Sequence, residues 1–123
     1  MADIESGEQL LAKARREGDR HMMAVYLGAL GLMYADERGN FRKGIQYLEE
    51  GKQIFESLRE WDDVAAVCNN LAGCFEIGMR DLALAAKYMG IAASVASATN
   101  PMKREYQARA ADMQKRLKGI GFA

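Results

Sequence analysis

The chain has 123 residues with 17 basic and 17 acidic side chains, so its formal net charge is zero. This length suits a single domain with a real core, and the neutral balance argues against a protein that follows nucleic-acid phosphates. Half of the residues are apolar and only one, Pro101, is a proline. Plentiful Ala, Leu, Met, Glu, Lys and Arg then favour an all-α fold over residues 1–123.

Turn and capping signals predict six helices. Ser6 is the expected N-cap of the first, Gly39-Asn40 is a strong stop after the second, Asp81 caps the fifth and Pro101 opens the sixth. The loops are short, so consecutive helices should pack as antiparallel neighbours. The expected ranges, ending with an apolar tail, are 6–18, 19–38, 41–58, 61–78, 81–99, 101–118 and 119–123.

An internal repeat appears when the sequence is shifted by 41 residues. Small residues then fall on small ones and large on large, and Tyr47 falls on Tyr88. A glycine inside a helix costs about 1 kcal/mol relative to alanine, so glycines kept at such positions indicate close helix packing. The helix-interior glycines and the alanines that align with them are Gly31 with Ala72, Gly44 with Ala85, and Gly51 with Ala92.

The spacing Leu27-x-x-Leu30-Gly31-x-x-Tyr34, followed by Gly44 and Leu48, resembles the tetratricopeptide repeat (TPR). Its second copy is Cys68-x-x-Leu71-Ala72-x-x-Phe75, followed by Ala85 and Met89. The period is seven residues longer than the family's 34, which is similar to the longer repeats of kinesin light chains and bacterial regulators. The resemblance implies a right-handed α-α superhelix with repeats at 19–58 and 61–99. The first helix would be a leading half-unit and the last a capping helix.

In the resembled family, partners usually lie in a concave groove lined by the first helix of each repeat. The resemblance therefore implies a protein or peptide partner, bound as an extended segment or a helix. Of the groups that some members use to clamp a carboxylate, only Asn70 is present, which argues against that ligand. The expected groove residues are Val25, Gly28, Leu32, Ala35, Asp36, Ala66, Asn69, Asn70, Gly73, Glu76, Ile77, Gln107 and Ala110.

The residue inventory argues against an enzyme or a metalloprotein. One histidine, His21, cannot build a histidine-based metal site, and Cys68 and Cys74 lie outside the CxxC spacing. No phosphate-binding glycine motif and no GxSxG occurs. We expect no cofactor and no chemistry of its own.

Two other functions remain open beside a protein-binding scaffold. Residues 49–63 carry six acids and two bases, and residues 102–118 carry the reverse, so the chain could form a homo-oligomer as a structural subunit. A ligand- or peptide-sensing regulatory domain is the third. The polar N-terminus and the absence of a run of about 20 apolar residues indicate a cytoplasmic protein without membrane insertion.

Overall fold

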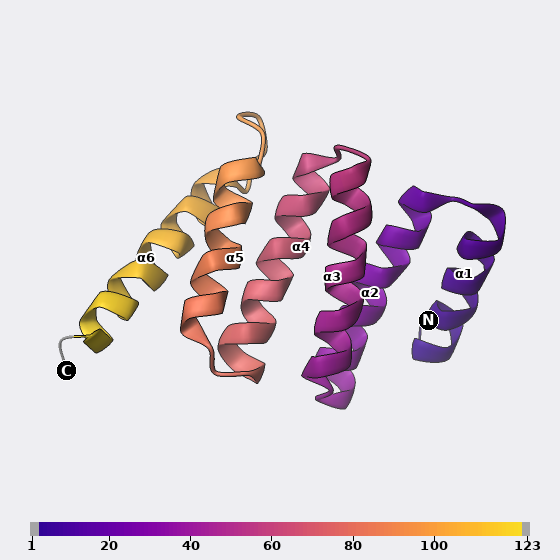
Figure 1. Cartoon of the computed structure of the whole chain (residues 1–123), viewed down its shortest axis with the longest axis horizontal. Coiled ribbons are helices and arrows are strands. Elements are labelled where there is room, and N and C mark those ends of the chain that lie inside the picture. Colours follow the sequence, from indigo (N-terminus) through magenta and orange to yellow (C-terminus); the bar gives the residue numbers. More distant parts are fainter. Residues whose placement is uncertain (1–2, 122–123) are drawn as a thin grey trace. The chain divides into compact units, whose positions relative to one another are not determined.

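The computed structural model describes residues 3–121, with side chains as far as Gly119. The described chain is all-helical and divides between Glu60 and Trp61 into two compact units, unit 1 and unit 2. Within each unit, consecutive helices run in opposite directions (Figure 1), as predicted. The elements are α1 (Ile4–Glu17), α2 (Arg20–Arg38), α3 (Phe41–Ser57), α4 (Trp61–Gly73), the π-helix η1 (Cys74–Gly78), α5 (Leu82–Val95) and α6 (Lys103–Gly121).

Short polar residues begin four of these helices by local hydrogen bonds. The carboxylate or amide oxygens of Asp19, Asn40 and Asp81 each accept a hydrogen bond from a backbone N–H three residues on, which satisfies a donor that the first turn leaves unpaired. The first helix differs from its prediction, because its N-cap is Asp3. Ser6 lies inside α1, and its backbone N–H donates to the Asp3 carboxylate at 2.7 Å.

In unit 1, α2 and α3 approach each other closely along a line of glycines. A Cβ built on Gly31 would lie 2.8 Å from the carbonyl oxygen of Gly44, and one on Gly44 would lie 2.6 Å from the carbonyl oxygen of Gly31. A Cβ on Gly51 would lie 3.2 Å from the carbonyl oxygen of Ala24. The prediction of close packing at these glycines is confirmed, because backbone stands where each side chain would go.

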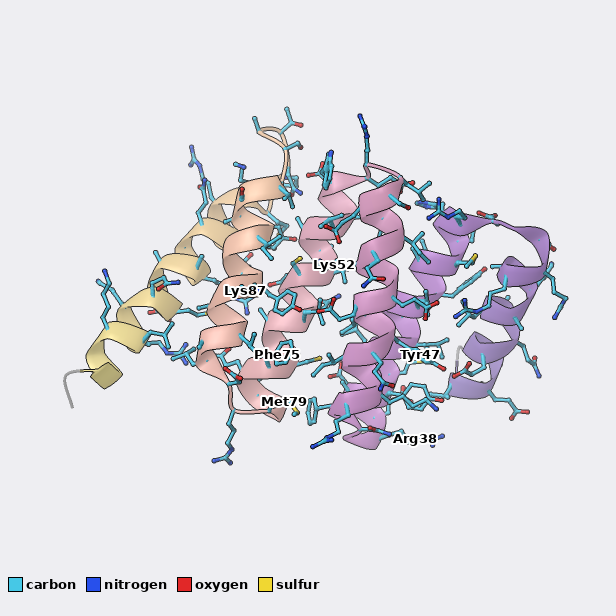
Figure 2. All side chains as sticks on the ribbon, in the orientation of Figure 1. Arg38, Tyr47, Lys52, Phe75, Met79 and Lys87 are labelled. Atoms are coloured by element: carbon cyan, nitrogen blue, oxygen red, sulfur yellow. The ribbon has the colours of Figure 1, made fainter. Side chains whose placement is uncertain are left out.

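Helix α1 packs on the α2–α3 hairpin through an apolar cluster and a pair of hydrogen bonds. Ile4 and Leu11 of α1 are buried against Leu27 and Leu30 of α2. Beside them, one carboxylate oxygen of Glu8 accepts hydrogen bonds from the hydroxyls of two tyrosines. These are Tyr34 at 3.0 Å and Tyr47 at 2.7 Å, the latter labelled in Figure 2. Burial, followed by the bond to Glu8, raises the pKa of Tyr47, so its hydroxyl remains the donor at neutral pH.

In unit 2, α4 packs on α5 and α5 packs on α6. Phe75 of η1, labelled in Figure 2, stacks on Tyr88 of α5 with ring centroids 5.4 Å apart. The π-helix replaces the α-helix that was expected over 61–78 from Cys74 onward. The buried hydrophobic residues of this unit are Val64, Ala65, Val67, Cys68, Leu71, Ala72, Cys74, Ala85, Ala86, Met89, Ala92, Ala96, Tyr106 and Met113.

The boundary between the last two helices was predicted wrongly. Helix α5 ends at Val95 rather than Thr99, and α6 begins after Pro101 rather than at it. The cause is Asp62, whose carboxylate accepts from the backbone N–H of Ser97 at 2.7 Å, from the Ser97 hydroxyl at 2.9 Å and from the Asn100 amide at 2.9 Å. These bonds divert the chain from the helical path.

Helix α6 begins with a contact to the end of α5 and extends further than predicted. The amine of Lys103 donates to the carbonyl oxygens of Ala93 and Ala96, which satisfies acceptors at the end of α5. Helix α6 continues through Gly119 to Gly121, so these residues are not a tail as expected. Residues 122–123 of the expected tail lie outside the described residues.

The bonds to Asp62 predict a pH-dependent contribution to stability. The Ser97 N–H first, then the side chains of Asn100 and Ser97, hold the pKa of Asp62 below its usual value of 3.8. A depressed folded-state pKa means that the contribution is present above the unfolded-state pKa and is lost as the pH falls through the folded-state pKa. We therefore expect Asp62→Asn to lower the free energy of unfolding near neutral pH, and we expect its difference from the wild type to shrink as the pH falls below the usual pKa of 3.8.

Urea unfolding followed by circular dichroism at several pH values measures this difference. Asp36→Asn, which removes an exposed carboxylate from α2, is the matched control and should leave the pH dependence unchanged. A gap between the wild type and Asp62→Asn that stays constant from neutral to acid pH would contradict the role assigned to the Asp62 carboxylate.

Two backbone features of the turn between the helices of each hairpin recur at the 41-residue offset that the sequence predicts. Gly39, with φ +62°, and Arg80, with φ +51°, hold the same left-handed turn position. The hydrogen bond from the Asn40 N–H to the Tyr34 carbonyl recurs from Asp81 to Phe75. Left-handed backbone disfavours residues with a Cβ, so its recurrence at the same offset indicates that one hairpin geometry occurs twice.

The same offset places α1 in register with α3. Gly18, with φ +68°, ends α1, and Arg59, with φ +57°, follows α3 at the equivalent position. The bond from the Asp19 N–H to the Ala14 carbonyl recurs 41 residues on, as 3.0 Å bonds in both places. The turn that follows α1 therefore has the same local geometry as the turn that follows α3.

Candidate functional site

One side of α2 remains accessible while its other sides pack on α1 and α3. We define the α2 face as Val25, Gly28, Leu32 and Asp36, which follow a spacing of three or four residues. Val25 is 38% exposed, and Gly28 and Leu32 are half-buried. Among the described residues, no atom outside the backbone of α2 itself and the neighbouring residues lies within 4 Å of the position that a Cβ on Gly28 would take. The α2 face is therefore mainly apolar and open, with one carboxylate near its end.

Ala35 does not belong to the α2 face, contrary to the prediction. It is 2% exposed, and its Cβ would lie 3.2 Å from a Cβ on Gly44. One residue along a helix turns the side chain by about 100°, so Ala35 points into the contact with α3 while Asp36 points to solvent. Ala35 contributes to the helix packing and is not available to a partner.

The equivalent side of α4 and η1 is more polar. We define the α4 face as Ala66, Asn69, Asn70, Gly73, Glu76 and Ile77. Ala66 is exposed, and the two asparagines, Gly73 and Glu76 are half-buried. Ile77 lies in η1 and is 74% exposed. A π-helix is frequent at functional sites, and here it holds a large apolar side chain in solvent.

Two arginines of α6 reach the α4 face, and neither was predicted as a site residue. One guanidinium nitrogen of Arg109 donates to the side-chain oxygen of Asn69. Arg116 lies 2.7 Å from a carboxylate oxygen of Glu76 and 3.5 Å from one of Asp112. The bond to Glu76 raises the pKa of Arg116, so this guanidinium is charged at any pH that the folded protein meets.

The two α6 residues that were expected in the groove differ in how far they are exposed to solvent. Gln107 is exposed and Ala110 is half-buried. Tyr106 and Met113 anchor this helix, because they are only 4% and 2% exposed. Met102 precedes α6 and is 39% exposed. A spacing of seven residues explains the two anchors, because it returns a side chain to nearly the same face.

A hollow of about 270 Å³ lies where α6 faces η1. It is lined by three carboxylates and two guanidinium groups, together with apolar atoms of α6. It is open to solvent, so α6 does not close tightly over this end of the α4 face. The lining residues are Glu76, Glu105, Ala108, Arg109, Asp112, Met113 and Arg116.

The histidine and the two cysteines, the other side chains that could bind a metal or react, lie in contact with the rest of the fold. Nδ1 of His21 lies 2.6 Å from a carboxylate oxygen of Glu60, and the ring meets Phe55 edge-on with centroids 5.9 Å apart. Cys68 and Cys74 are both buried. Within residues 3–121, no helix is long and apolar enough to cross a membrane.

Similarity to known proteins does not indicate a function for this chain, so a proposal has to start from the α2 face and the α4 face. No protein-family model, no curated protein and no solved structure matches the chain.

Proposed function

We propose that the chain is a cytoplasmic protein-interaction module built from two TPR-like helix pairs, without chemistry of its own. Its α2 face and α4 face bind a peptide or helix of another protein. The recurrence of one hairpin geometry at a 41-residue offset supports the repeat assignment. Repeats of this kind use the accessible sides of their helices as binding surfaces.

The observation that carries the proposal is Gly28. A helix-interior glycine costs about 1 kcal/mol relative to alanine, and Gly31 and Gly44 are explained by the backbone they contact. Gly28 has no such contact with any of the residues that the structure describes. Its neighbours one turn away are Val25 and Leu32, so it is a flat point on an apolar surface. A partner whose chain comes close to α2 at this point accounts for the missing side chain.

Gly28→Arg is expected to weaken peptide binding by about tenfold or more, because a long charged side chain would stand in the middle of the α2 face. The side chain has open space, so the fold should remain. Peptides selected from a random library on the immobilised full chain serve as the probe, and fluorescence anisotropy gives each dissociation constant.

Gly90→Arg is the matched control. Gly90 is also helix-interior with nothing near its Cβ position, but it lies on α5 between the exposed polar residues Lys87 and Ser94. It should leave binding within about twofold. Equal losses in the two variants, or no loss in Gly28→Arg, would refute the assigned face. A sedimentation experiment showing that the chain assembles with itself, and that Gly28→Arg abolishes this, would identify the partner as a second copy.

A further inference from the structure

Helix α6 is attached by few buried side chains. Among its residues 103–119, only Tyr106 and Met113 are buried, whereas the shorter α4 buries six. Burial of one such side chain contributes about 1.5–3 kcal/mol, so α6 has fewer such contributions than the other two α-helices of unit 2, α4 with six buried residues and α5 with four. The open hollow beside η1 agrees with incomplete packing.

The polar contacts of α6 repeat the spacing of its apolar ones. Arg109 follows Tyr106 by three residues, and Arg116 follows Met113 by three. We call this the α6 heptad pattern: a large apolar residue is followed by an arginine three positions later, and the pair recurs after seven residues. The arginines meet Asn69 and Glu76, which are themselves seven residues apart on the α4 face.

The match in spacing has a simple geometric origin. Seven residues of α-helix rise about 10.5 Å and return to nearly the same side, so Arg109 and Arg116 stand in line on α6 and reach Asn69 of α4 and Glu76 of the π-helix η1 together. Asn69 and Glu76 are both residues that were expected to contact a partner. The α4 face is therefore already occupied, in part, by a helix of the same chain.

We propose that α6 is a displaceable internal occupant of the α4 face, and that the partner of this face is a helix carrying the α6 heptad pattern. This rests on the proposed function, because it assumes that the α4 face binds a partner. Such a helix would replace Tyr106 and Met113 in their apolar contacts and donate from its arginines to Asn69 and Glu76. The apparent affinity for the partner helix equals the intrinsic affinity multiplied by the fraction of chains in which α6 is displaced.

The first test is hydrogen exchange of the intact chain. The amides of α6 should exchange through local opening, faster than those of α5. Arg109→Ala/Arg116→Ala should raise the exchange rates in α6 by about tenfold and leave those of α5 unchanged. The control Arg104→Ala/Lys115→Ala removes the same charge from exposed positions of α6 and should change neither.

The second test uses a fluorescent synthetic peptide with the sequence of residues 101–119. The full-length Arg109→Ala/Arg116→Ala variant should bind it about tenfold more tightly than the wild-type chain does, because its own α6 competes less. The same two substitutions in the peptide should weaken binding by a similar factor. Exchange of α6 only on global unfolding, or no peptide binding by either chain, would overturn the proposal.

The two proposals fail in distinguishable ways. If library peptides bind and Gly28→Arg weakens them while the α6 peptide never binds, the displaceable helix is wrong and the proposed function stands. If the α6 peptide binds and the α6 amides open locally while Gly28→Arg has no effect on any selected peptide, the α2 face is wrong and the displaceable helix stands.

Discussion

Gly44→Ala is expected to lower the free energy of unfolding by about 3 kcal/mol, and Gly31→Ala by a similar amount. Each new Cβ would stand within 3 Å of a carbonyl oxygen of the opposite helix, and backbone cannot move aside as a side chain can. Alanine returns about 1 kcal/mol through its helix propensity, which is smaller than the cost of separating α2 from α3. Urea unfolding followed by circular dichroism measures the change.

Gly28→Ala is the matched control, because it makes the same substitution on α2, one turn away from Gly31. Nothing lies within 4 Å of its Cβ position, so only the gain in helix propensity remains. We expect it to stabilise the protein by about 0.5–1 kcal/mol. If Gly44→Ala and Gly28→Ala changed stability in the same direction, the close approach of α2 and α3 would be wrong.

The repeat explains why alanine is excluded at one position and present at its equivalent. In unit 2, Ala72 and Ala85 stand where unit 1 has Gly31 and Gly44, and both alanines are fully buried. The position demands a small residue in both hairpins. Glycine is required only where the carbonyl oxygens themselves occupy the space of a Cβ.

Helix starts were predictable from the sequence because their causes are local. Asp19, Asn40 and Asp81 each bond to a backbone N–H three residues away, so the cap and its helix are adjacent in the sequence. The end of α5 was not predictable in this way. It depends on Asp62, which accepts hydrogen bonds from Ser97, 35 residues further on.

In the candidate site, too, local features could be predicted from the sequence and contacts between distant residues could not. The resemblance to the repeat family was enough to predict Val25, Gly28 and Leu32, which lie on one accessible side of α2. It failed at Ala35, because neighbouring residues on a helix point in directions that differ by about 100°. The contacts of Arg109 and Arg116 with the α4 face join residues 40 apart. Their seven-residue spacing was visible in the sequence, but not the surface that they would meet.

Leu30→Ala is expected to lower the free energy of unfolding by about 3–4 kcal/mol. Leu30 is fully buried in the cluster with Ile4, Leu11 and Leu27, so the substitution leaves a cavity between α1 and α2. Leu10→Ala removes the same atoms from a side chain of α1 that is 41% exposed, and it should change stability by no more than about 0.5 kcal/mol. A cost at Leu30 no greater than that at Leu10 would contradict the cluster.

Gly7 provides a sharper test of the same contact. A Cβ on Gly7 would lie 2.7 Å from Cδ2 of Leu30, so Gly7→Ala in the wild-type chain must displace that leucine. In the Leu30→Ala background the obstacle is gone, and the gain in helix propensity should stabilise the chain by about 1 kcal/mol. The double-mutant cycle should therefore be non-additive, with Leu30→Ala costing less when Gly7 is already alanine. Additive effects would mean that α1 does not rest on α2 at Gly7, because only a shared space can make the two substitutions depend on each other.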